Sequence, residues 1–251
     1  MINEFNSIIS KFKEINAKGY IKGVNNNLLN SCGLTFENLL GKKADSMFFP
    51  DYNNIEIKCK QRFSRYDINL FSLSFDGPEL YESNYLLQYY GIKNKDFNNK
   101  KELFVNFKYR KKILVDDKYY FELDIDDEIK RIFINIYDID YKLIEKRGFI
   151  DFDTINTRVN VKIKNLALIY ASKKKQKDDL YFRYYKIVCL AYKDFDTFIK
   201  LIKNDVIKLS LILRFSKSDQ DIGKNKNKNM IFKISDRDIE VLYNRIYLYE
   251  K

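Results

Sequence analysis

The chain has 251 residues, a formal net charge of +11, and 45% hydrophobic and 16% aromatic residues. This aromatic content excludes an intrinsically disordered chain, and the length allows a large core without disulfides or a structural metal. Histidine is absent, which removes mechanisms built on imidazole, including the serine and cysteine triads and most zinc hydrolases.

The sequence also predicts where the protein works. No apolar run approaches the ~18 residues that a membrane span needs, and the first residues do not form a secretory signal. The three cysteines are odd in number and widely spaced, which is typical of reduced thiols and not of a disulfide framework. We therefore expect a cytoplasmic protein with no membrane partner.

The basic charge favours a polyanionic partner, because clustered Lys and Arg gain free energy from phosphates and from the counterions they release. Lys, Asn, Ile, Phe and Tyr are all abundant, however, and an A+T-rich genome favours these residues. Charge alone therefore leaves nucleic-acid binding and codon bias as equal explanations.

The first predicted elements precede residue 75. Apolar residues at three- and four-residue spacing over 2–15 predict an amphipathic helix. Thr35 is expected to cap a short helix that Gly41 ends. Strict alternation over 54–60 predicts a strand with Glu and Lys on one face, and 67–74 is expected to be its partner strand.

The rest of the chain mixes strands and helices. We expect strands at 103–107, 118–124, 131–137, 166–171, 181–192, 206–215 and 230–234. Residues 194–203 are predicted to be helical, Ser235 to cap a final helix that carries Ile239, Leu242, Tyr243 and Ile246, and 154–165 is ambiguous. No Gly-, Ser- or Pro-rich linker divides the chain, so we predict one α/β domain with two lobes.

The segment most informative about chemistry begins at Pro50. Asp51 follows this proline at the start of a turn, and Glu56 and Lys58 are two residues apart on a strand, so they share a face. If the turn brings Asp51 beside them, two carboxylates and the carbonyl of Ile57 offer the hard oxygen ligands that suit Mg²⁺. A neighbouring ammonium would help to position an attacking water at a phosphate.

Spacing alone does not single out this site. Roughly five acid-x-Lys triplets are expected by chance in such a chain, and Asp116–Lys118 is another example. Glu56 and Lys58 on a solvated strand face are therefore an alternative interpretation.

Other basic and polar residues are candidates for contacts with DNA. Lys60 and Arg62 continue the face of Lys58 and are suited to phosphates, with a solvated strand edge as the alternative. The loop after 206–215 carries side chains suited to reading base edges, with an ordinary surface loop as the alternative. Its candidate DNA-binding residues are Arg214, Ser216, Lys217, Asp219, Asp221, Lys224, Asn225 and Asn227.

Three ordered motifs carry a family resemblance: Gly33-Leu-Thr-Phe-Glu37-Asn-Leu-Leu-Gly41, then Pro50-Asp51, then Ile55-Glu56-Ile-Lys58-Cys-Lys60-Gln-Arg62. Their order resembles that of the PD-(D/E)xK nucleases, and more narrowly the MvaI/BcnI restriction endonucleases and the related MutH-type nickases. The resemblance is specific over 33–74 and loose between 80 and 190. The chain departs from the pattern expected of many relatives, because Lys224–Asn229 stands where they carry a histidine.

The resemblance implies a restriction-endonuclease-like fold, with a mixed β-sheet core flanked by helices and two lobes around a DNA cleft. It implies a catalytic lobe of roughly 1–110 plus 150–192 and a recognition lobe of roughly 193–251. It makes Asp51 and Glu56 metal ligands, Lys58 the catalytic lysine and Glu37 an accessory acid.

The implied activity is that of a Mg²⁺-dependent type II restriction enzyme that cuts double-stranded DNA to 5′-phosphate and 3′-hydroxyl ends. The resemblance also implies a monomer, and a DNA methyltransferase encoded nearby would be its partner in a restriction-modification system. Two alternatives stay open at this point: a MutH-like mismatch-repair nickase and a non-catalytic DNA-binding protein.

Overall fold

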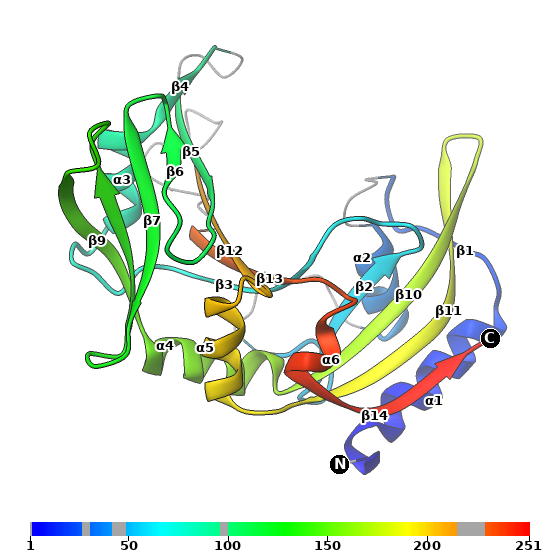
Figure 1. Cartoon of the computed structure of the whole chain (residues 1–251). Coiled ribbons are helices and arrows are strands. Elements are labelled where there is room, and N and C mark those ends of the chain that lie inside the picture. Colours follow the sequence, from blue (N-terminus) through cyan, green and yellow to red (C-terminus); the bar gives the residue numbers. More distant parts are fainter. Residues whose placement is uncertain (1, 27–30, 42–48, 96–99, 215–228) are drawn as a thin grey trace. The chain divides into compact units, whose positions relative to one another are not determined.

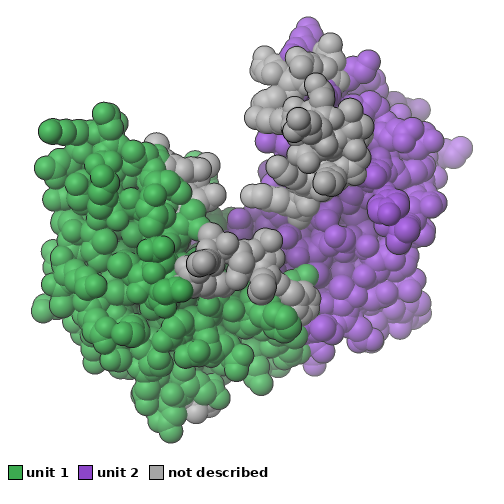
Figure 2. Space-filling model, turned by 180° about the vertical axis from the view of Figure 1, so that it is seen from behind, with its two compact units in different colours: residues 1–68, 158–194, 236–251 green, residues 69–157, 195–235 purple. Residues whose placement is uncertain are grey.

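The computed structural model describes residues 2–26, 31–41, 49–95, 100–214 and 229–251. The chain forms two compact units, which Figure 2 shows in different colours. Unit 1 comprises 1–68, 158–194 and 236–251, and unit 2 comprises 69–157 and 195–235. The chain crosses between them after residues 68, 157, 194 and 235.

The boundaries of the units differ from those of the predicted lobes. Strand β5 (Lys100–Asn106) pairs with β12 (Ile207–Arg214), so it belongs to unit 2 and not with the N-terminal segment. Strand β14 (Tyr243–Glu250) pairs with β11 (Asp179–Tyr192), so the C-terminal residues belong to unit 1. Long-range strand pairing decided both assignments, and local patterns in the sequence do not report it.

Unit 1 is built on a mixed sheet with the strand order β1-β11-β10-β2, and β14 also pairs with β11 (Figure 1). Strands β10 and β11 form a long antiparallel hairpin, and β2 runs parallel to β10. Besides β11 and β14, the elements of unit 1 are α1 (Ile2–Ala17), β1 (Ile21–Lys22), α2 (Ser31–Leu39), β2 (Glu56–Gln61), a π-helical turn (Val159–Ile163), β10 (Asn165–Gln176) and α6 (Ile239–Leu242).

Helices α1 and α2 cover one face of this sheet. The apolar stripe of α1, which includes Phe5, Ile8 and Phe12, packs with Phe36 of α2. Both helices pack against Ile57 and other apolar residues of the sheet in one buried cluster. The periodicity of residues 2–15 predicted this helix, and the structure confirms it. The opposite face of β2 carries the polar side chains of Glu56, Lys58 and Lys60.

Strand β2 lies at the end of the sheet order, and its neighbour is β10. The expectation that 67–74 pairs with β2 is wrong. Those residues form β3 (Ile68–Leu73), which pairs with β13 (Asn229–Ile234) in unit 2. The other edge of β2 accepts no such strand because an upstream turn folds against it, as described below.

Two further predicted elements differ in the structure. Helix α2 begins at Ser31, so Thr35 lies inside it and its hydroxyl donates to the Ser31 carbonyl at 2.6 Å. The predicted final helix is only α6, after which Tyr243 begins strand β14. Pairing with β11 overrides the helical spacing of the apolar residues in this segment.

Unit 2 contains two antiparallel sheets, one with the order β3-β13-β12-β5-β4 and one with the order β6-β7-β8-β9. In the first sheet, stacked aromatic rings of Phe71, Phe198 and Phe232 join β3, α5 and β13. The remaining elements of unit 2 are α3 (Glu82–Tyr90), β4 (Ile92–Asn94), β6 (Ile113–Val115), β7 (Tyr119–Asp126), β8 (Arg131–Tyr137), β9 (Leu143–Asp151), α4 (Phe152–Arg158) and α5 (Phe195–Lys203).

The overall class agrees with the prediction of a mixed α/β protein with helices against β-sheets. The ambiguous segment 154–165 is α4 followed by the π-helical turn. In the described part of the chain, no helix combines the length and the apolar character required to traverse a bilayer.

Candidate active site

A two-residue turn brings Asp51 alongside β2. Asn53 and Asn54 have φ angles of +43° and +63°, a left-handed region that Asn tolerates well. The residues that flank this pair exchange backbone hydrogen bonds of 2.9 and 2.7 Å, so the chain reverses direction. Asp51 Oδ2 then accepts a hydrogen bond of 3.0 Å from the backbone N–H of Ile57.

The same hydrogen bond occupies the edge of β2 that faces away from β10, and no strand of the described residues pairs there. The N–H of Ile57 bonds to a side chain, so it is not available to another strand. The N–H and C=O of one strand residue point to the same side, so the carbonyl of Ile57 lies on the edge beside Asp51. Asp51 therefore lies beside the backbone of Ile57, and its charge also acts on Glu56.

Glu56 and Lys58 share the face of β2 that turns away from α2. Lys58 Nζ donates to Glu56 Oε1 at 2.6 Å, and the two side chains are 25% and 2% exposed. Asp116 and Lys118 form a similar pair at 2.7 Å, but they are 38% and 65% exposed. Burial therefore separates the candidate triplet from this other acid-x-Lys triplet and argues against a solvated strand face.

Lys162 is a second cation at Glu56, and the sequence did not reveal it. Its Nζ lies 2.9 Å from Glu56 Oε2 and donates to the carbonyl of Phe49 at 2.9 Å. The π-helical turn after α4 carries Lys162, and its side chain is 15% exposed. Lys162 lies 104 positions after Lys58 in a segment without clear periodicity, so no signal in a single sequence links the two.

Glu56 is held in an unusual electrostatic environment. Burial raises the pKa of Glu56, the ammonium of Lys58 opposes this rise, Asp51 adds to it, and Lys162 opposes it again. The buried Oε2 has an ion-pair partner, but among the described residues none donates a well-aligned hydrogen bond to it. A buried carboxylate oxygen in this state is suited to an additional cation.

These residues fit a divalent ion with few protein ligands. In the described ranges, no group of three or more Cys, Asp or Glu side chains is arranged to hold a metal. Mg²⁺ is commonly bound by one or two carboxylates, with waters and substrate oxygens completing its coordination. Asp51, Glu56 and the Ile57 carbonyl match that pattern.

Glu37 lies on α2, which packs on the face of β2 that carries Ile57 and Cys59, whereas Glu56 and Lys58 point to the other face. A hydrogen bond with Cys32 and burial raise the pKa of the Cys59 thiol, and the charges of Glu37 and Asp51 raise it further. Glu37 is therefore near β2, and its role as an accessory acid stays a prediction.

The predicted phosphate contacts on β2 lie in different environments. Lys60 is 10% exposed, forms a short ion pair with Asp236, and donates to the carbonyl of Tyr66 at 3.2 Å. Arg62 is exposed at the end of the strand, and its backbone N–H donates to the carbonyl of Ala171 at 2.7 Å. Arg62 is thus the more accessible of the two.

Most of the predicted base-reading loop lies outside the described residues. This applies to Ser216, Lys217, Asp219, Asp221, Lys224, Asn225 and Asn227. Arg214, at the end of β12, is 51% exposed at its side chain, lies 3.4 Å from Glu102, and has its guanidinium 4.6 Å from the centroid of the Phe104 ring. These contact roles stay predictions.

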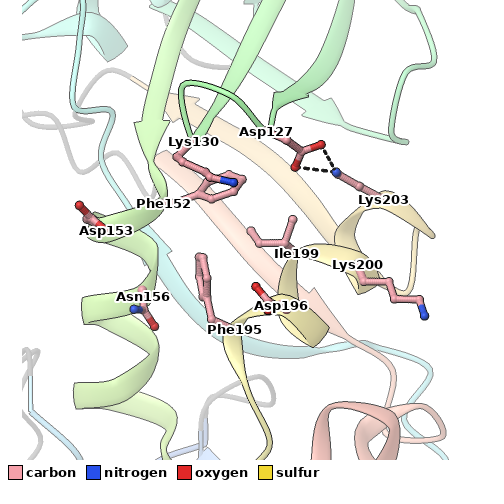
Figure 3. Close-up of a pocket in the computed structure, with 10 residues that line it drawn as sticks. All are labelled: Asp127, Lys130, Phe152, Asp153, Asn156, Phe195, Asp196, Ile199, Lys200 and Lys203. Carbon is pink, nitrogen blue, oxygen red and sulfur yellow. Dashed lines mark hydrogen bonds and ion pairs between the residues drawn. The ribbon is translucent and has the colours of Figure 1, made fainter.

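A pocket of about 560 Å³ lies in unit 2, between α4, α5 and the turn that joins β7 to β8 (Figure 3). It is lined by three aspartates and three lysines, and the Lys203 ammonium contacts both carboxylate oxygens of Asp127 at 2.7 and 2.5 Å. None of its lining residues is a predicted site residue.

The fold of the chain is similar to that of solved restriction endonuclease structures. A solved complex of restriction endonuclease MvaI with its cognate DNA substrate has a TM-score of 0.86 to this chain, with 22% identity over 98% of this chain and 97% of that chain. MvaI in the absence of DNA has a TM-score of 0.60, with 21% identity over 96% and 95% of the two chains.

The model of the MvaI/BcnI restriction endonuclease family matches residues 9–243, and the chain belongs to this family. It is therefore a type II site-specific deoxyribonuclease, as the motifs predicted. No protein with curated annotation matches the chain.

Proposed function

We propose that this chain is a Mg²⁺-dependent endonuclease that cuts double-stranded DNA at a short specific sequence and leaves 5′-phosphate and 3′-hydroxyl ends. The observation that supports this proposal is that Asp51 accepts a hydrogen bond from the backbone of β2 at Ile57, while Glu56 and Lys58 form a largely buried ion pair on the same strand. Duplex DNA as the substrate is supported by the family and by the cognate DNA in the similar MvaI complex.

Each residue of this site has a distinct task. Asp51, Glu56 and the carbonyl of Ile57 would hold the divalent ion, which when bound supplies positive charge to the phosphate and to the departing 3′ oxygen. Lys58, fixed by its 2.6 Å contact with Glu56, orients the attacking water and contributes charge beside the phosphate. Lys162 is a positioning residue, because it acts on the reaction through Glu56.

Lysine and arginine side chains account for the affinity for DNA in this proposal. The net charge of +11 attracts phosphates, and Lys60, Arg62 and Arg214 are the described candidates for contacts. We expect the protein to act as a monomer and to be paired with a methyltransferase that protects the same sequence.

The decisive experiment incubates the purified protein with plasmid DNA and Mg²⁺, and then sequences the ends of the products. Discrete fragments with identical 5′-phosphate ends are expected. Circles nicked in one strand only would instead indicate a MutH-like nickase. A protein that shifts the plasmid on a gel but never cuts it would be a DNA-binding protein without catalysis.

The site assignment is tested by Asp51→Ala, which removes one proposed metal ligand and the hydrogen bond to Ile57. We expect no detectable cleavage and nearly unchanged DNA binding, measured by gel shift with Ca²⁺. Asp116→Ala is the matched control, because Asp116 belongs to the exposed acid-x-Lys triplet. Cleavage by Asp51→Ala at the rate of this control would remove the assignment.

A further inference from the structure

The loop that follows β2 exposes an aromatic ring which the proposed function does not use. Phe63 is 89% exposed, and Tyr66 in the same loop is 76% exposed. A large apolar side chain gains stability when it is buried, and Phe63 buries almost none of its surface. The core of unit 1 therefore does not explain why an aromatic residue stands at this position.

The backbone at Phe63 is also unfavourable for phenylalanine. Its φ of +65° lies in the left-handed region, which glycine and asparagine adopt readily and bulky residues rarely do. Strain of this kind gathers at functional sites, where a particular side chain is needed despite the backbone. An exposed and strained phenylalanine thus points to a contact outside the chain.

The loop is anchored at both ends, so it presents the ring from a fixed position. The N–H of Arg62 donates to the Ala171 carbonyl of β10 at 2.7 Å, and the N–H of Ser64 donates to the Gln61 carbonyl at 3.0 Å. Lys60 donates to the carbonyl of Tyr66 at 3.2 Å. A ring held this way loses little conformational freedom when it meets a ligand.

The charges around the ring favour a polyanion. Arg62 and Arg65 are both exposed and lie on either side of Phe63 in the sequence, and the Arg62 guanidinium is 5.1 Å from the centroid of the ring. Arginines that contact phosphates, with an aromatic ring between them that contacts bases, form a combination suited to nucleic acid.

The position of the loop limits where on the DNA it can act. Phe63 is five residues after Lys58, and five residues span at most about 18 Å of backbone. That distance corresponds to about five steps of 3.4 Å along one DNA strand. The ring is therefore within reach of base steps beside the phosphate that is cut.

We propose that Phe63 stacks on or inserts between DNA bases near the cut, while Arg62 and Arg65 bind the flanking phosphates. This proposal rests on the proposed function as a DNA endonuclease. It assigns base contact to a loop of unit 1, whereas the residues predicted to read bases lie in the loop after β12.

The test uses a short duplex that carries the site mapped by sequencing fragment ends, with Ca²⁺ in place of Mg²⁺, and with 2-aminopurine at each position near the cut. For the wild type, we expect the fluorescence to change at one base step. Phe63→Ala should abolish this change and weaken binding about 5- to 150-fold, the range expected for loss of one stacked base. Ile2→Ala, on helix α1, is the control and should match the wild type in both readouts.

The salt dependence separates the ring from the arginines. Arg62→Ala and Arg65→Ala should each reduce the slope of log affinity against log salt by about one phosphate contact, whereas Phe63→Ala should leave the slope unchanged. Phe63→Gly should weaken binding as Phe63→Ala does, but with a melting temperature equal to or above that of the wild type, because glycine relieves the backbone strain.

Two results would overturn the proposal in different ways. If the wild type cuts the duplex and Phe63→Ala binds as tightly with the same fluorescence change, the role of the loop is wrong and the nuclease function stands. If the wild type neither binds nor cuts duplex DNA, the proposed function fails and the role of the loop fails with it.

Discussion

Lys162 offers the sharpest test of how the candidate active site is stabilised. Lys162→Met keeps a long side chain but removes the ammonium that lies 2.9 Å from Glu56 Oε2 and from the carbonyl of Phe49. Breaking a buried ion pair on one side costs about 3–5 kcal/mol, and Lys58 still pairs with the other oxygen of Glu56. We therefore expect a loss of about 2–3 kcal/mol in the free energy of unfolding.

Urea unfolding at neutral pH measures this loss, with Lys164→Met as the control. Lys164 is exposed and only two positions further along the chain, so its replacement should change stability by less than about 0.5 kcal/mol. Equal stability of the two variants would refute the inference that Lys162 supports Glu56.

The pH dependence of the loss gives an independent check. Burial already raises the pKa of Glu56, so stability is lost as the pH rises through that pKa and the carboxylate becomes charged. Without Lys162 the pKa of Glu56 rises further, so the deficit of the variant should be largest where the carboxylate is charged and should shrink as the pH falls through its raised pKa and Glu56 becomes protonated in both proteins. A deficit independent of pH would show that the lost ammonium does not act through this charge.

Two other predictions concern metal binding and the packing of unit 2. Mg²⁺ should raise the melting temperature of the free protein, and this increase should grow as the pH rises through the elevated pKa of Glu56, because the metal binds the ionised carboxylate. Thermal scans at several pH values measure the increase, with Glu56→Gln as the control. An equal increase in that variant would contradict the prediction. Arg147→Met should destabilise the protein by about 3–5 kcal/mol, since it leaves the buried carboxylate of Glu82 without the bidentate contact at 2.9 and 2.8 Å. Chemical unfolding measures this loss. A loss below about 1 kcal/mol would show that the ion pair contributes little to stability.

The geometry of the candidate site on β2 was predictable because its contacts are local. The Asn pair at 53–54 encodes the turn that returns Asp51, and strict alternation places Glu56 and Lys58 on one face of the strand. The eight residues from Asp51 to Lys58 contain the turn, the strand edge and the ion pair. The contribution of Lys162 could not be predicted, because it depends on how a distant π-helical turn packs against β2.

The errors in the predicted fold share a cause. Adjacent strands in a sequence usually pair, which favoured a hairpin of β2 and β3, but the edge that β3 would need already bonds to Asp51. Likewise, Tyr243 and Ile246 have helical spacing, yet their segment is the strand that pairs with β11. In both places a long-range backbone contact outweighed a local preference.

Unit 1 is formed by three separate segments of the chain, and this has a consequence for biosynthesis. Its sheet needs β2 near residue 60 and also β14, which ends at Glu250, and unit 2 is synthesised between these strands. Domains generally fold as units during translation. A polypeptide released before β14 is made therefore lacks one strand of this sheet, so the unit 1 sheet is complete only at the end of synthesis.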